Sequence, residues 1–188
     1  MSNEILGDRR KTLEDAFFAL QDAKHRHALV QKETMKVRKA TLSEVSGISD
    51  DAVLERLIAL EIGPDTLTAL TLIPLIEVAW ADGDVDANER NAILEAASAA
   101  GVSKDSTSAQ LLESWLVQRP TPDVLIAWKE YVTSLLETLS TPEKQALKQD
   151  LLGRARAVAQ AAGGFMGIGN KISKSELAVL EEMEGLFA

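Results

Sequence analysis

The stretch EVAWADGDVDANER, residues 77–90, joins the end of one predicted helix to the start of the next. Gly83 has no Cβ atom, so it is the residue expected to make the turn. Asp86 is the predicted N-cap of the second helix. Glu89 stands three residues later, where a glutamate completes a capping box with its N-cap residue. The stretch therefore predicts a helix–loop–helix unit.

Outward from this unit, apolar residues recur at helical spacing, and no stretch alternates apolar and polar residues as a strand would. Proline and glycine stand mostly between the apolar runs, where helices begin and end. We therefore expect an all-α bundle of about eight helices. Their expected ranges are 8–45, 52–61, 65–80, 86–100, 105–118, 121–139, 141–162 and 173–187.

Several of these helices carry predicted N-terminal caps. Asp65 is expected to cap the apolar helix 65–80, and Thr121 and Thr141 each precede a proline at the first helical position. The residues expected in the core recur at spacings of three or four within their helices. They are Leu72, Leu75, Ile76, Trp80, Ile93, Leu94, Trp128, Leu135, Leu136 and Leu180.

A degenerate second copy of the helix–loop–helix unit is predicted at residues 169–176. Ser173 aligns with Asp86 and Glu176 aligns with Glu89, so each copy has an N-cap residue and a glutamate at N3. The acidic turn of the first copy is replaced by glycine, asparagine and lysine. The second copy keeps the capping pattern and loses the carboxylates.

The first copy concentrates four carboxylates, those of Asp82, Asp84, Asp86 and Glu89. Hard cations such as Ca²⁺ and Mg²⁺ take oxygen ligands that converge from a bent backbone, which makes this loop a candidate metal site. The alternative is purely structural. In it, Gly83 makes the turn, Asp86 and Glu89 cap the helix, and the other two carboxylates are solvated.

These residues resemble the Ala-Asp-Gly-x-(Val/Ile)-x-x-x-Glu signature of the tellurite-resistance TerB-like family, and the resemblance covers about residues 65–188. It implies an all-helical fold built around two helix–loop–helix units and a role in metal or tellurite stress. It also implies that the acidic loop binds a divalent cation. The implied ligands are Asp82, Asp84 and Asp86, and Glu89 matches the glutamate of the signature.

The first predicted helix is long and mildly basic, and an organisational boundary is expected near Pro64. This gives an N-terminal helical arm over residues 1–64 and a TerB-like domain over residues 65–188. Residues 1–48 hold nine Lys/Arg and seven Asp/Glu, whereas residues 49–188 hold eleven and twenty-two. The arm is therefore expected to act apart from an acidic bundle.

Leu13, Phe17 and Leu20 form the contact stripe expected on this arm, for a protein partner or for a second copy of the chain. The opening of the helix, residues 8–17, is similar to the start of the ATPase-inhibitor zeta-subunit family, which favours an interaction helix. The alternative is that the helix packs along its own bundle.

The composition of the whole chain excludes several functions. Its 188 residues include 20 Lys+Arg, 29 Asp+Glu and no Cys, so disulfides, thiolate metal sites and cysteine nucleophiles are absent. The net charge of −9 disfavours general binding to nucleic acid. The longest apolar stretch, residues 67–80, is too short and polar to span a bilayer, and residues 1–20 lack a signal-peptide pattern. A cytoplasmic location is the default expectation.

Catalytic residue types are scarce. His25 and His27 are the only histidines, and on a helix they point about 200° apart, so they cannot chelate one ion together. The glycine-rich residues 163–169 follow a helix instead of a strand, which disfavours a nucleotide-binding loop. We therefore expect a non-enzymatic TerB-like protein with one candidate cation site. The alternative is an assembly protein that acts through its first helix, and a metal-dependent hydrolase is a third class.

Overall fold

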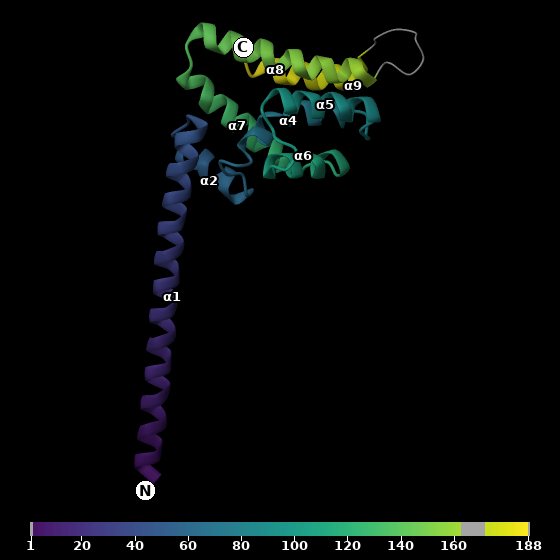
Figure 1. The fold of residues 1–188 in the computed structure, drawn as a ribbon. Helices are drawn as coiled ribbons and strands as arrows, with labels where there is room; N and C mark the ends of the chain where they lie inside the picture. The colour runs from purple at the N-terminus through teal and green to yellow at the C-terminus, as the bar shows by residue number, and fades with distance from the viewer. Residues whose placement is uncertain (1, 163–171, 188) are drawn as a thin grey trace. The chain divides into compact units, whose positions relative to one another are not determined.

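The structure, a computed structural model, describes residues 2–162 and 172–187, and their side chains from Leu20 onward except those of Asp22 and Ala162. Within these residues it is all-helical, as the sequence predicts, and no strand is present (Figure 1). Its helices are α1 (Ser2–Ser46), α2 (Asp51–Ala59), α3 (Leu67–Thr71), α4 (Ile73–Ala79), α5 (Ala87–Ala99), α6 (Thr107–Val117), α7 (Pro122–Thr138), α8 (Thr141–Ala162) and α9 (Lys174–Gly185).

The chain divides into two compact units, Met1–Thr41 and Leu42–Ala188. The first unit is one helical segment, most of α1, and the second contains the end of α1 and all the other helices. The boundary predicted near Pro64 is therefore misplaced. Ile48, Leu57 and Ile62 precede that proline, yet each is almost fully buried in the core of the second unit.

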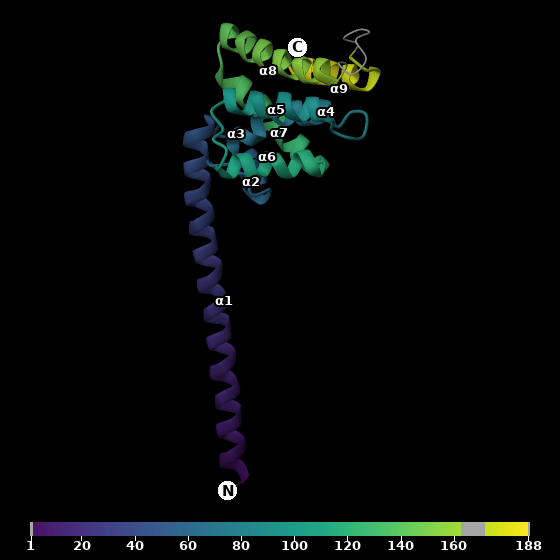
Figure 2. The same ribbon diagram turned by 45° about the vertical axis from the view of Figure 1, so that its right-hand side comes forward.

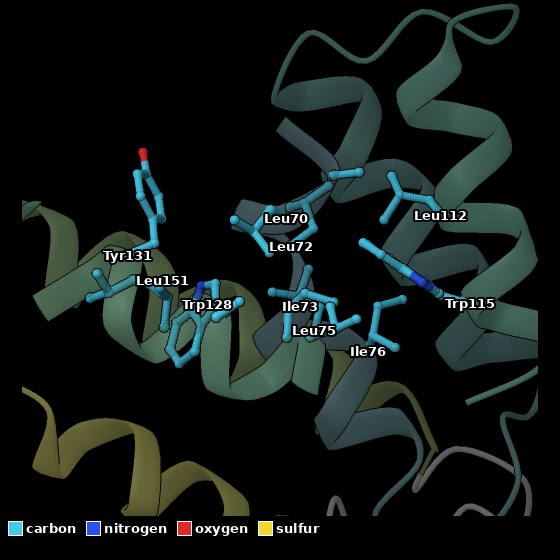
Figure 3. Close-up of a cluster of buried hydrophobic side chains, with 14 of the residues drawn as sticks. Leu70, Leu72, Ile73, Leu75, Ile76, Leu112, Trp115, Trp128, Tyr131 and Leu151 are labelled. Carbon is cyan, nitrogen blue, oxygen red and sulfur yellow. The ribbon is translucent and has the colours of Figure 1, made fainter. Parts of the chain in front are cut away.

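The core of the second unit is built around α4, in which every residue is buried. α8 packs on α4 and α5, and α9 packs on α8 and α4, so three helices enclose this short apolar segment. Figure 2 shows α8 and α9 side by side, as does the view in Figure 1. Figure 3 shows Ile73, Leu75 and Ile76 among the buried side chains of the cluster.

The predicted core residues are all at least partly buried. Trp80, Leu94, Leu135 and Leu136 are partly buried and pack against the core from its edge. The other six lie inside it with at most 2 % of their surface exposed. These six are Leu72, Leu75, Ile76, Ile93, Trp128 and Leu180.

The predicted helix 65–80 is wrong as a single element, because the chain breaks at Leu72 into α3 and α4. Pro74 lies in the first turn of α4; its nitrogen has no hydrogen to donate and its ring excludes a continuous helix through this point. The predicted cap is also misplaced. Thr66, not Asp65, is the N-cap of α3, and its hydroxyl accepts from the Gly63 N–H at 2.9 Å.

Other helix boundaries follow local signals. Thr121 is the N-cap of α7, as predicted. Thr141 is already the first residue of α8, and the preceding Ser140 donates from its backbone N–H to Glu143. α1 ends before Gly47, whose φ of +73° is a conformation that glycine adopts without strain. Among the described residues, no helix has the length and apolarity needed to cross a membrane.

Candidate functional site

The acidic loop lies between α4 and α5 and turns at Gly83, as predicted. The Gly83 N–H donates to the Trp80 carbonyl at 3.2 Å, and Gly83 has a φ of +114°, which any Cβ atom would strain. Asp82 and Asp84, on either side of this glycine, are exposed to solvent. The loop therefore presents two of its carboxylates to water.

The other two carboxylates form the predicted capping box. The Asn88 and Glu89 N–H groups donate to Asp86 Oδ1 at 2.7 and 2.8 Å, and the Asp86 N–H donates back to Glu89 Oε2 at 2.8 Å. These bonds satisfy N–H groups that a helix N-terminus otherwise leaves without partners. The alternative, structural role of Asp86 and Glu89 is thus confirmed.

The second copy of the unit has the same geometry at the start of α9. The Glu176 N–H donates to Ser173 Oγ at 3.1 Å, and the Ser173 N–H donates to Glu176 Oε2. The alignment between the two copies is therefore confirmed at their N-cap and N3 positions. Residues 169–171, which replace the acidic turn, lie outside the described residues, as does the rest of the glycine-rich segment.

Glu89 is the electrostatically unusual member of this group. Glu89 is only 2 % exposed, and burial raises the pKa of its carboxyl from 4.5 to about 7. The hydrogen bond from Asp86 lowers this pKa, while the negative charges of Asp86, Asp82 and Glu176 raise it further. The effect of Glu176 shows that the packing brings the N3 glutamates of the two copies into electrostatic range.

The four carboxylates of the first loop do not form a ready cation shell. In residues 2–162 and 172–187 there is no group of three or more His, Asp or Glu side chains placed to hold one metal ion. Two carboxylates point to solvent and two are engaged in capping, so an ion would need to reorganise the loop. A divalent cation at Asp82, Asp84 and Asp86 stays a prediction.

Two further residues of the opening stretch have roles that the sequence did not suggest. Glu77, in the middle of α4, is 4 % exposed and pairs with Arg119 at 2.7 Å. Trp80 Nε1 donates to the Trp115 carbonyl at 2.8 Å, near the end of α6. Both contacts fasten α4 to the end of α6. The position of Glu77 within an apolar run could have indicated a buried ion pair, but not that Arg119 is its partner.

A small cavity of about 80 Å³ lies between α4, α7 and α8, with Trp128 and Leu75 among its lining residues. Trp128 Nε1 is the one buried side-chain nitrogen or oxygen, within the described part of the chain, that has no hydrogen-bond partner. A cavity of this size is well below the volume of a typical ligand pocket, which is several hundred Å³.

Before its buried Leu42, the described part of α1 exposes its large apolar side chains. Leu20 is 56 % exposed, and Val30 and Val37 are each more than half exposed. Leu13 and Phe17, the other two residues of the predicted contact stripe, lie outside the described side chains. The single described member of that stripe is therefore available to a partner.

Comparison with known proteins does not identify the chain. No protein family, no curated protein and no solved structure matches it. The resemblance of residues 77–90 to the TerB-like signature stays a prediction from the sequence.

Proposed function

We propose that the protein acts by assembly, through association of its α1 helix with a second copy of the chain. The observation that carries this proposal is the exposure of apolar side chains along α1. Nine large hydrophobic residues are exposed in the described part of the chain, and six of them lie on this one helix. They are Leu20, Leu29, Val30, Met35, Val37 and Val45.

Part of this apolar surface has the spacing of a helix-pairing seam. From Leu20 onward, exposed residues at alternating spacings of three and four form a line along the helix. All of them are apolar or small except for one histidine. This alternation keeps one face of a helix turned to a partner in two-stranded coiled coils. We call this line the α1 stripe; it consists of Leu20, Ala23, His27, Val30, Thr34 and Val37.

A single helix cannot cover its own apolar face, so a stripe of this kind gains free energy when a second helix packs on it. Because the stripe includes Ala23 and Thr34, each layer buries little area, and we expect association to be weak and concentration-dependent. A second copy supplies a matching stripe. In a parallel pair, Glu33 beside the stripe would face Arg38 of the second copy, an attractive flanking contact.

The test compares two neighbouring residues of α1 that are rotated about 100° from each other, one inside the α1 stripe and one outside it. Val30 lies in the α1 stripe and Leu29 lies off it, although both are about 60 % exposed (64 % and 60 %). Sedimentation of the full-length chain should show concentration-dependent association, which Val30→Glu weakens and Leu29→Glu leaves unchanged. A chain that stays monomeric at every concentration, or two variants that behave alike, would refute the assembly proposal.

A cation-binding role is the second candidate, and it comes with the TerB-like resemblance and its link to metal or tellurite stress. What favours it is the pair of exposed carboxylates, Asp82 and Asp84, in one short turn. Calorimetric titration with Ca²⁺ and Mg²⁺ should then give a binding heat that Asp84→Asn diminishes. No heat at millimolar metal would remove this candidate. Neither candidate calls for catalysis, and we propose a non-enzymatic protein.

A further inference from the structure

His27 lies within the α1 stripe, whereas His25 lies on the opposite face of the same helix. Two residues along a helix correspond to a rotation of about 200°, which separates the two imidazoles. Both histidines are exposed in the described chain. Association through the stripe would bury His27 and leave His25 in water. The only two histidines of the chain thus form a matched pair, one inside the proposed interface and one outside it.

Cationic residues outnumber carboxylates around His27 along α1. Lys24 lies one turn before it and Arg26 directly beside it. The nearest carboxylates along the helix are Asp22, five residues before His27, and Glu33, six residues after it, which correspond to about 7.5 Å and about 9 Å along the helix axis. A second copy brings the same set of charges to the other side of the interface.

We propose that His27 makes the assembly of this protein sensitive to pH, an inference that rests on the proposed association through α1. An imidazolium loses its hydration when it enters an apolar interface, and nearby cations repel it further. No carboxylate stands three or four residues from His27, the spacing at which side chains of one helix meet. The neutral imidazole can be buried, so acid should favour the separate chains.

The size of the effect follows from proton linkage. Each associating pair buries two imidazoles, so both must be neutral before the helices can pack. The ordinary pKa of a histidine side chain is about 6.5. Lowering the pH from 7.5 to 5.5 should therefore weaken association by up to about tenfold for each imidazole, or about 100-fold for the pair. If the associated helices can hold one protonated His27, the dissociation constant changes by less than this factor.

The experiment measures the dissociation constant of the full-length chain by sedimentation at pH 7.5 and pH 5.5. His27→Gln keeps a polar, neutral side chain in the stripe, and His25→Gln is the matched control. We expect the wild-type chain and His25→Gln to lose association on acidification, and His27→Gln to associate equally at both pH values. Circular dichroism at each pH establishes that the helices are intact.

The outcomes separate this inference from the proposed function. Association at pH 7.5 that does not change at pH 5.5 overturns the pH inference and leaves assembly standing. The same holds if His27→Gln keeps the full pH dependence, or if His25→Gln abolishes it. A wild-type chain that is monomeric at pH 7.5 overturns both.

Discussion

Replacement of Glu89 by glutamine should make the protein more stable at pH 8 and leave its stability nearly unchanged at pH 4. Glu89 is almost fully buried, and its pKa is raised from 4.5 to about 7, with burial as the largest cause. Glutamine can still accept the hydrogen bond from the Asp86 N–H, because either residue completes a capping box at N3. The substitution therefore removes the ionisation and keeps the cap.

The sign follows from proton binding in the two states. Between pH 4.5 and about 7, the folded chain holds the Glu89 proton more tightly than the unfolded chain does. The contribution of Glu89 to stability is therefore greatest at low pH and is lost as the pH rises through this window. A pKa unit corresponds to about 1.4 kcal/mol, so the loss is at most about 3 kcal/mol.

The assay is urea denaturation followed by tryptophan fluorescence at several pH values, for the wild-type chain and Glu89→Gln. We expect the difference in the free energy of unfolding to grow in favour of the variant, from near zero at pH 4 toward about 3 kcal/mol at pH 8. Glu95→Gln, at an exposed position of α5, serves as the control and should change stability little. A variant less stable than wild type at pH 8, or a difference that does not vary with pH, would refute the reasoning.

Three further substitutions test other contacts by the same denaturation assay. Asp86→Ala and Ser173→Ala each remove an N-cap and should each lower the free energy of unfolding by about 0.5–2 kcal/mol; an unchanged midpoint in either would contradict the capping geometry. Arg119→Met leaves the Glu77 carboxylate buried without its cation and should cost about 2 kcal/mol, whereas a stabilised variant would show that the pair contributes nothing. Trp128→Phe removes an indole N–H that has no partner, so it should cost less than about 1.5 kcal/mol despite complete burial, and a larger loss would point to an unrecognised acceptor.

Much of the fold was predictable from residues that act over one helical turn. The capping boxes at Asp86 and Ser173 each need only two residues three apart in the chain, so the sequence predicts them without knowledge of the fold. Gly47 marks a helix end for the same local reason. The break at Leu72 was also a local event, because Pro74 cannot donate its backbone hydrogen bond, but the apolar periodicity of residues 65–80 concealed it.

Most of the helices and the capping boxes at Asp86 and Ser173 could be predicted from the sequence, because hydrogen bonds between near neighbours specify those features. The burial of Glu89 within electrostatic range of Glu176 and the ion pair between Glu77 and Arg119 depend on the packing of the whole fold. These pairs are far apart in the chain, and the packing of α4 among α5, α8 and α9 controls their burial. Four carboxylates in one stretch predicted a shared cation site. In the structure, Asp86 and Glu89 are instead hydrogen-bonded in a capping box, and packing buries Glu89.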